Sequence, residues 1–301
     1  MIALILPKAF DFIAAGVVEG LNVLRIRYTS DVESNGSRFC SMSDSRELIK
    51  SGAKTIIVLG LGTDVAVRDI IPDWRNVIVI DGTDHSDFEY FKVLGVQPHQ
   101  CRGLLKREYI KYWDARRLPS VYPFPMCITS CDRGPIVDKD IFLSFMCNER
   151  TNPLRGAIKG FLQNFKFEYP DIHLDSTNEC AYDAWNPRPQ NIDTPLYHQI
   201  LGRSLISVSV PGAGYDCKRY WEIVGMRALL VSYEHHLVIP NDFENGKHKI
   251  EISRVEDIEA VMRNIRSNLG YAIDLINSAF EHGRLHHSVE ARASQVLELL
   301  Y

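Results

Sequence analysis

The stretch at residues 207–232 constrains the fold more than any other part of the chain. It consists of an apolar run, a Pro-Gly-Ala-Gly loop at 211–214, an amphipathic segment and a second apolar run. A strand, loop, helix and strand in this order are typical of an α/β protein with a mostly parallel sheet. We expect Asp216 to open the helix, because Asp is a preferred N-cap residue.

The loop in this stretch has the chemistry of a phosphate site. Gly212 and Gly214 lack a Cβ, so backbone N–H groups can approach a ligand closely there. The predicted helix points its positive dipole end at the same place. Arg219 and Glu222 lie three residues apart and so share one helix face, which offers a cation for phosphate and a carboxylate for sugar hydroxyls. The segment therefore predicts a nucleotide-sugar or dinucleotide ligand.

The same alternation of apolar and amphipathic segments runs through all 301 residues, a length that favours two domains. The proline-rich residues 113–135 are the best candidate for a crossover between them. Gly270 is expected to weaken or kink the long helical pattern in which it lies. Strands are predicted at 2–6, 21–28, 55–59, 76–80, 103–105, 141–146, 172–175, 205–210, 228–232 and 248–251, and helices at 10–19, 44–51, 64–71, 87–94, 153–164, 257–280 and 287–300.

Composition excludes several classes of protein. A net charge of −4 gives no overall basic field for nucleic acid. Seven cysteines at irregular spacings do not suggest a disulfide framework and favour a reducing compartment. No apolar run reaches the roughly 18–20 residues that span a bilayer. We therefore expect a soluble, cytoplasmic protein.

A second glycine turn offers a competing interpretation. The predicted strand at 55–59 runs into Gly60-Leu-Gly62, and Asp81 ends the next strand about 20 residues later, which is the outline of a dinucleotide-binding fingerprint. Val65 stands where that fingerprint has a third glycine or alanine, and the unit is not the first of its domain. An NAD-dependent oxidoreductase that uses Gly60 and Gly62 is thus an alternative, although glycines at a strand end are common as simple turns.

Together with the segment at 211–222, five further segments resemble, in order, motifs of the GT-B glycosyltransferases. The likeness is to the "glycosyl transferases group 1" set that includes CgeB-like proteins and, more distantly, exostosins. The sequence departs from the family at Leu105, which replaces an aromatic residue, and at 147–150, where the family glycine is not evident. The segments are Val-Ile-Val-Ile-Asp-Gly-Thr-Asp at 77–84, Leu-Leu-Lys-Arg-Glu at 104–108, Pro-Phe-Pro at 123–125, the strand and loop at 142–155, and His-His-Ser-Val-Glu-Ala-Arg-Ala at 286–293.

This resemblance implies two Rossmann-like domains with a cleft between them. It implies an N-terminal acceptor-side domain at 1–130, a C-terminal nucleotide-sugar-binding domain at 131–285 and a last helix at 286–301 that packs back on the first domain. The activity it implies is hexosyl or pentosyl transfer from a nucleoside-diphosphate sugar of the UDP or GDP type, which is a co-substrate, so that no cofactor is expected.

The resemblance also assigns roles to residues. Arg219 would neutralise the donor diphosphate, and Glu222 would bind ribose or sugar hydroxyls. The further donor-binding candidates are Gly212, Ala213, Gly214, Arg150 and Arg155, and Lys106 and Arg107 could line the cleft on the acceptor side. Each of these charged side chains could instead serve as an ordinary surface or ion-pair residue.

Direct displacement of the nucleotide needs a base to deprotonate the acceptor hydroxyl. Asp84 and His85 are the candidates, because they follow a strand's carboxyl end, where α/β sites lie, although Asp84 could simply be a turn residue. The histidines and cysteines show no spacing typical of a metal site. The enzyme is therefore expected to be metal-independent.

Two alternatives concern the partner. The chain could be a catalytically silent nucleotide-sugar-binding module, because fold alone does not give function. The acceptor, either a glycan, a small molecule or a modified DNA base, is not defined by the sequence. If the acceptor is a modified DNA base, a stripe of cations could bind along the phosphate backbone of the DNA. The members of this stripe are Arg102, Lys106, Arg107, Lys111, Arg116 and Arg117.

Overall fold

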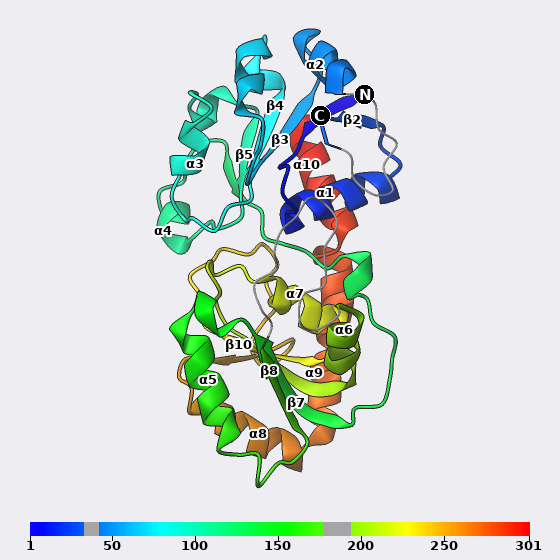
Figure 1. Cartoon of the computed structure of the whole chain (residues 1–301), viewed down its shortest axis with the longest axis vertical. Helices are drawn as coiled ribbons and strands as arrows, with labels where there is room; N and C mark the ends of the chain where they lie inside the picture. Colours follow the sequence, from blue (N-terminus) through cyan, green and yellow to red (C-terminus); the bar gives the residue numbers. More distant parts are fainter. Residues whose placement is uncertain (33–41, 177–193) are drawn as a thin grey trace.

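The computed structural model describes residues 1–32, 42–176 and 194–301. Two α/β domains lie one above the other in Figure 1, each built on its own parallel sheet. The prediction of two Rossmann-like domains is confirmed. Within the described residues, no helix is both long and apolar enough to cross a bilayer.

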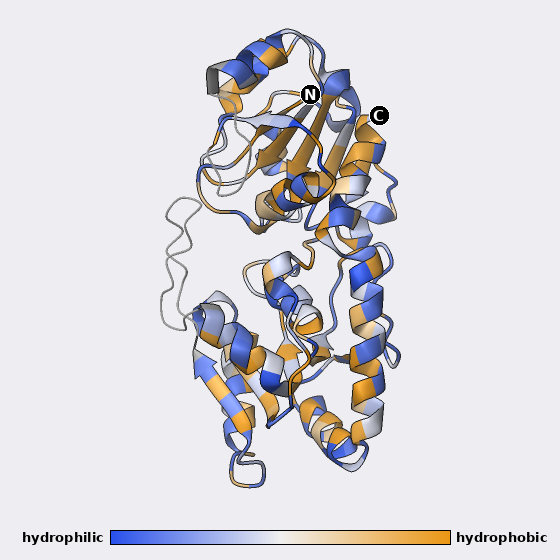
Figure 2. Cartoon of the chain, turned by 90° about the vertical axis from the view of Figure 1, so that its right-hand side faces the viewer, coloured by the Kyte–Doolittle hydropathy of each residue, from blue (hydrophilic) through white to orange (hydrophobic). Residues whose placement is uncertain are grey.

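The first domain holds a six-stranded sheet in the order β2-β1-β3-β4-β5-β6, with every pairing parallel. The central strands are fully buried, and Figure 2 shows them as mostly hydrophobic. Its elements are β1 (Ile2–Ile5), α1 (Phe12–Val23), β2 (Tyr28–Ser30), α2 (Met42–Lys50), β3 (Thr55–Leu59), β4 (Val77–Asp81), α3 (Glu89–Lys92), β5 (Gly103–Lys106), α4 (Lys111–Asp114) and β6 (Val121–Pro123).

The second domain holds a five-stranded parallel sheet in the order β11-β10-β9-β7-β8. The strand order reverses between β7 and β9, which makes this pair the topological switch point of the sheet. Its elements are β7 (Ile141–Cys147), α5 (Pro153–Gln163), β8 (Ile172–Ser176), α6 (Thr194–Arg203), β9 (Ser204–Ser209), α7 (Lys218–Gly225), β10 (Leu229–Tyr233), β11 (Ile250–Ile252) and α8 (Asp257–Ser267).

The last two helices tie the domains together. Helix α9 (Leu269–His286) runs along the second domain, and α10 (Val289–Leu300) continues upward to lie beside α1 of the first, as Figures 1 and 2 show. A Cβ on Gly20 would lie 2.3 Å from the backbone oxygen of Val289, so only glycine permits this approach of the two helices. Lys54 Nζ also donates to Leu300 O (2.7 Å).

Several element boundaries differ from the sequence predictions. The predicted strand at 21–28 is wrong, because α1 continues to Val23 and buries Leu21; an apolar run of this length suits either structure. The long helix at 257–280 is two helices that meet at Asn268, whose side chain caps α9, so the break precedes Gly270. The short strand β6 and the helix α6 were not predicted. The described cysteines are all free thiols, whereas Cys40 and Cys180 lie outside the described residues.

Candidate functional site

A cleft of about 560 Å³ opens between the two domains. Its upper wall comes from the segment that follows β4 and from Glu108, which follows β5. Its lower wall comes from residues that follow β7 and β9, among them the predicted glycine loop. The lining residues are Asp84, His85, Ser86, Asp87, Glu108, Asn152, Leu154, Pro211, Gly212, Ala213, Gly214, Tyr215, Tyr233, Glu234 and His236.

The lower wall coincides with the switch point of the second sheet. Asn152 and Leu154 follow β7, and residues 211–215 follow β9, the strands between which the order reverses. Ligands of open α/β sheets bind outside the carboxyl ends of the strands at this point. The topology therefore marks the glycine loop as a ligand site without reference to its sequence.

The loop presents backbone donors to the cleft. Gly212 N donates to Gly214 O (2.9 Å), which folds the loop into a tight turn. The N–H groups of Ala213 and Gly214 have no acceptor within the described part of the chain. Helix α7 begins after the loop, with Cys217 at its N-cap, one residue later than the sequence predicted. Asp216 instead accepts hydrogen bonds from Met126 N (2.6 Å) and Trp221 Nε1 (2.8 Å).

Arg155, predicted to contact phosphate, lies directly against this loop. Its Nε donates to Pro211 O (3.0 Å) and its Nη1 to Asn148 O (3.2 Å). The side chain is buried, whereas Arg150 is exposed. Neither arginine lines the cleft.

Arg219 and Glu222 lie on α7 behind the loop and face α6. The hydroxyl of Tyr197 donates to Glu222 Oε2 (2.8 Å), and burial raises the pKa of the Glu222 carboxyl. The Arg219 side chain is 8% exposed, and its Nη1 has no partner among the described residues. A buried guanidinium nitrogen without an acceptor is a rare feature in proteins. Neither residue lines the cleft.

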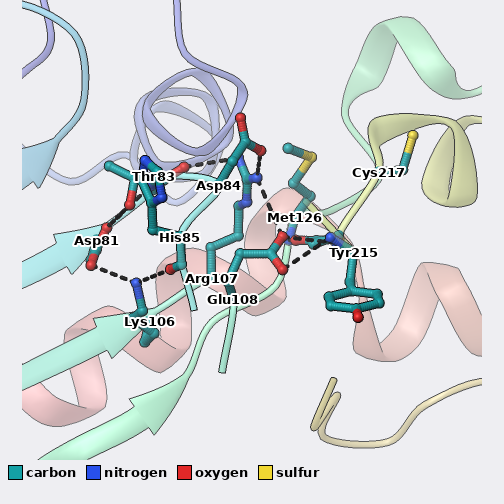
Figure 3. A network of polar contacts seen from close by, with 12 residues as sticks. Asp81, Thr83, Asp84, His85, Lys106, Arg107, Glu108, Met126, Tyr215 and Cys217 are labelled. Carbon is teal, nitrogen blue, oxygen red and sulfur yellow. Dashed lines mark hydrogen bonds and ion pairs between the residues drawn. The ribbon is translucent and has the colours of Figure 1, made fainter. Parts of the chain in front are cut away.

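The first domain contributes the predicted base candidates, Asp84 and His85, which both line the cleft (Figure 3). The side chain of Asp84 is 52% exposed and pairs with the guanidinium of Arg107. Buried Lys106 pairs with Asp81 (2.7 Å) and donates to the backbone oxygen of His85. The two basic residues predicted for the cleft therefore lie beneath it and support its wall.

The buried position of Lys106 and Arg107 corrects the predicted basic stripe. With side chains 0% and 6% exposed, they cannot follow a phosphate backbone. The other four members of the stripe (Arg102, Lys111, Arg116 and Arg117) are exposed.

Two carboxylates near the site were assigned no role from the sequence. Glu108 lines the cleft and accepts hydrogen bonds from Tyr215 N (3.0 Å) and Asp216 N (2.9 Å) of the opposite domain. Asp11 caps α1 by accepting from Ala14 N (2.8 Å), and burial raises its pKa to about 6, with the charges of Arg107 and Asp84 close by. An Asp just before an amphipathic run is an N-cap signal that could have identified Asp11. Glu108 ends the motif-like segment at 104–108, but no local pattern indicates its role, because its partners are more than 100 residues away.

The competing glycine turn lacks the geometry of a dinucleotide site. After Gly60 and Gly62 the chain forms a short 3-10 helix, Val65–Ile70, and not the α-helix whose N-terminus would hold a pyrophosphate. A Cβ on Gly60 would lie 2.8 Å from Pro7 Cγ, so the turn is packed against its own domain. Neither glycine lines the cleft.

One group of side chains has ligand atoms close enough to hold a metal ion. Single atoms of Asp132, His198 and Glu222 lie within 4.8 Å of one another. The ammonium group of Lys218, however, already pairs with Asp132 and supplies a positive charge there. The group lies outside the cleft.

Comparison with solved structures identifies the fold. No family model matches the chain, and no curated protein matches its sequence. An alpha-glucosyltransferase in complex with UDP-glucose and DNA containing an abasic site is 12% identical, with a TM-score of 0.63, and the match covers 99% of this chain and 98% of that one. T4 phage BGT in complex with UDP and Mn²⁺ is 8% identical, with a TM-score of 0.55, over 100% and 99% of the two chains.

TarM is 11% identical, with a TM-score of 0.56, and the match covers 88% of this chain but only 59% of the TarM chain. This protein therefore spans less than two thirds of TarM. These structures are GT-B enzymes, and the chain has the GT-B fold. At such low identity the likeness defines the fold alone, because one fold carries many functions.

Proposed function

We propose that this protein is a glycosyltransferase that moves a sugar from a nucleoside-diphosphate donor to a hydroxyl acceptor. The observation that carries the proposal is the composition of the cleft. A glycine loop at the switch point of one sheet lies across from Asp84 and His85 at the carboxyl edge of the other. A phosphate-type cradle and a base candidate thus face one volume, as a displacement reaction requires.

The donor diphosphate would lie on the loop. The N–H groups of Ala213 and Gly214 can donate to phosphate oxygens, and the N-terminus of α7 adds its dipole. Arg219 supplies a buried cation on α7, and its Nη1, which has no acceptor among the described residues, is available to donate to a ligand oxygen. Because these groups offer N–H donors and positive charge to a diphosphate, we propose that a UDP- or GDP-sugar binds without a metal.

The acceptor hydroxyl would approach from the first domain. Asp84 is half exposed, and its second oxygen is free to take a proton while Arg107 holds the first. His85 lies beside it, exposed, with its ring stacked on Tyr90 at 6.0 Å between centroids. We assign general-base chemistry to this pair, with Asp84 the first choice because its position is fixed by an ion pair.

A polyanionic acceptor is a second candidate, favoured by the position of α4. Trp113 Nε1 donates to Ser86 O (2.6 Å), which packs this helix against the cleft wall. Lys111, Arg116 and Arg117 are exposed there. A hydroxylated DNA base could therefore be the acceptor, in which case acceptor affinity should fall steeply as salt rises.

The proposal is tested by a thermal-shift panel of UDP, GDP, ADP, CMP and TDP compounds with NADH as the competing ligand. A nucleotide that binds the native state at 100 times its Kd stabilises it by about 2.7 kcal/mol, a shift of several degrees in Tm. We expect UDP or GDP to produce this shift and the matching sugar nucleotide to be consumed when an acceptor is added. Stabilisation by NADH alone would contradict the proposal.

A further inference from the structure

The Lys-Arg-Glu segment at 106–108 ends in a residue that crosses the cleft. Glu108 belongs to the first domain, yet both of its carboxylate oxygens accept from backbone N–H groups of the second. Tyr215 N lies 3.0 Å from Oε2 (Figure 3). Asp216 N lies 2.9 Å from Oε1. The glycine loop at 211–214, on which the sugar donor would lie, is called the donor loop below. Its end next to α7 is thus held by the carboxylate of Glu108 from the opposite domain.

The carboxylate of Glu108 is also linked, through Arg107, to the base candidate Asp84. Arg107 Nη2 lies 3.3 Å from Glu108 Oε1 and also pairs with Asp84. Arg107 Nη1 donates to Gly82 O (2.8 Å), which fixes the turn that carries Asp84. A continuous chain of contacts therefore runs from Asp84 through Arg107 and Glu108 to the loop.

Burial makes this chain stiff. The side chains of Arg107 and Glu108 are 6% and 1% exposed, whereas Asp84 is 52% exposed at the end of the chain. Ion pairs and charged hydrogen bonds that water cannot reach are stronger and more directional than exposed ones. The loop has also adapted to the carboxylate, because a Cβ on Gly214 would lie 2.4 Å from Glu108 Oε1.

On the proposed function, we propose that Glu108 is a positioning residue for sugar transfer. It fixes the distance between the donor loop and Asp84 by bridging to the N–H groups of Tyr215 and Asp216. It is not itself the base, since both oxygens are already occupied by donors. Its negative charge lies beside the cradle for a diphosphate and repels the donor. Glu108 therefore positions the loop at some cost in donor affinity.

The variant Glu108→Gln tests this role. The amide cannot accept both N–H groups, and it removes one negative charge near the loop. We expect kcat for transfer from a UDP-sugar to fall about 10- to 100-fold, because small displacements between reacting groups are costly. The Kd for UDP should stay the same or tighten. Glu108→Asp, which keeps the charge but is too short to reach, should lower kcat similarly without tightening UDP binding.

Glu19→Gln is the matched control. Glu19 Oε1 also accepts a distant backbone N–H, that of Ser130 (2.8 Å), but it lies outside the cleft. It should leave kcat and UDP affinity unchanged. Loss of kcat in both variants would overturn the positioning role, and so would a Glu108→Gln enzyme that keeps its kcat or that loses UDP affinity at unchanged kcat.

Amide hydrogen exchange at Tyr215 and Asp216 gives a readout that needs no nucleotide. We expect Glu108→Gln to accelerate exchange of both amides at least about 10-fold and Glu19→Gln to leave them slow, because only the first removes their acceptor. Unchanged exchange in Glu108→Gln would overturn the bridge itself. If the wild-type protein shows slow exchange but no binding or transfer with any nucleotide, the proposed function fails while the bridge stands, so the two failures are distinguishable.

Discussion

The guanidinium of Arg155 supports the donor loop directly beneath Gly212. A Cβ on Gly212 would lie 2.8 Å from Arg155 Nη2, and Arg155 Nε holds Pro211 O at 3.0 Å. The loop therefore rests on a buried cation, which fixes the backbone that is proposed to cradle phosphate. Position 212 favours glycine because the side chain of any other residue would meet Arg155.

The first prediction follows from this contact. Gly212→Ala forces Arg155 or the loop to move, so we expect the Kd for the nucleoside diphosphate to weaken about 10-fold, a cost of about 1.4 kcal/mol. Calorimetric titration with UDP or GDP measures it. Gly156→Ala on α5 is the control, because nothing lies within 4 Å of its new Cβ. Equal affinities in the two variants would show that the loop position does not matter.

The second prediction concerns the base. Asp84→Asn keeps the size of the side chain and removes its ability to take a proton, so we expect kcat to fall about 10²- to 10⁴-fold with nucleotide affinity nearly unchanged. His85→Ala should cost less. Initial rates of transfer from the sugar nucleotide measure both effects. A larger loss in His85→Ala than in Asp84→Asn would transfer the role of base to the histidine.

The third prediction concerns pH and stability. Burial raises the pKa of Asp11 from 3.8 to about 6, so the native state binds more protons than the unfolded state between those values. The contribution of Asp11 to the free energy of unfolding therefore falls as pH rises from about 4 to 6 and is flat above, by linkage. Asp31 has the same direction and a pKa of about 6, also because of burial, and adds to this slope.

Asp11→Asn isolates one of these contributions. Asn caps a helix about as well as Asp, so the cap on α1 is retained. We expect the variant to be more stable than wild type by about 1–3 kcal/mol at pH 7.5 and nearly equal to it at pH 4. Urea denaturation at the two pH values measures the difference. A variant that is less stable at pH 7.5 would mean that the charged form is favoured by the fold.

The fourth prediction concerns metal removal. Because Lys218 already supplies a cation to Asp132, we expect turnover in excess EDTA to equal turnover with added Mn²⁺. His198→Ala, which removes one member of the only candidate group found among the described residues, should leave turnover unchanged. Activity that is lost in EDTA and restored by Mn²⁺ would refute metal independence. Loss of that response in His198→Ala would then locate the ion.

Much of the fold could be predicted because its elements are locally encoded. The strand at 55–59 was predicted to the residue, since a five-residue apolar run between polar flanks leaves little choice. The run at 21–28 was misread, because α1 extends to Val23 and packs against α10 from the far end of the chain, and no local pattern indicates that packing. Helix α6 was not predicted either. A proline at its second position is compatible with a helix start, but the apolar residues after it show only a weak helical period.

The candidate site was likewise predicted only in part. The residues Gly212, Gly214 and Asp84 were found because a loop after a strand has a recognisable chemistry. Lys106 and Arg107 were found but placed on the surface of the cleft, whereas they are buried beneath it. The charge of a residue alone does not indicate whether its side chain lines the cleft or is buried behind the cleft wall.

The sequence by itself determined that this chain forms two α/β domains and that a glycine loop follows the strand that it predicted at 205–210. Periodicity and glycine placement act over a few residues, so they can be read locally. Only the tertiary structure decided that Glu108 spans the cleft to Tyr215 and Asp216 and that Arg219 lies behind the loop. These relationships depend on how two sheets pack through the crossover and α10, and that packing is set by contacts between residues more than 100 positions apart.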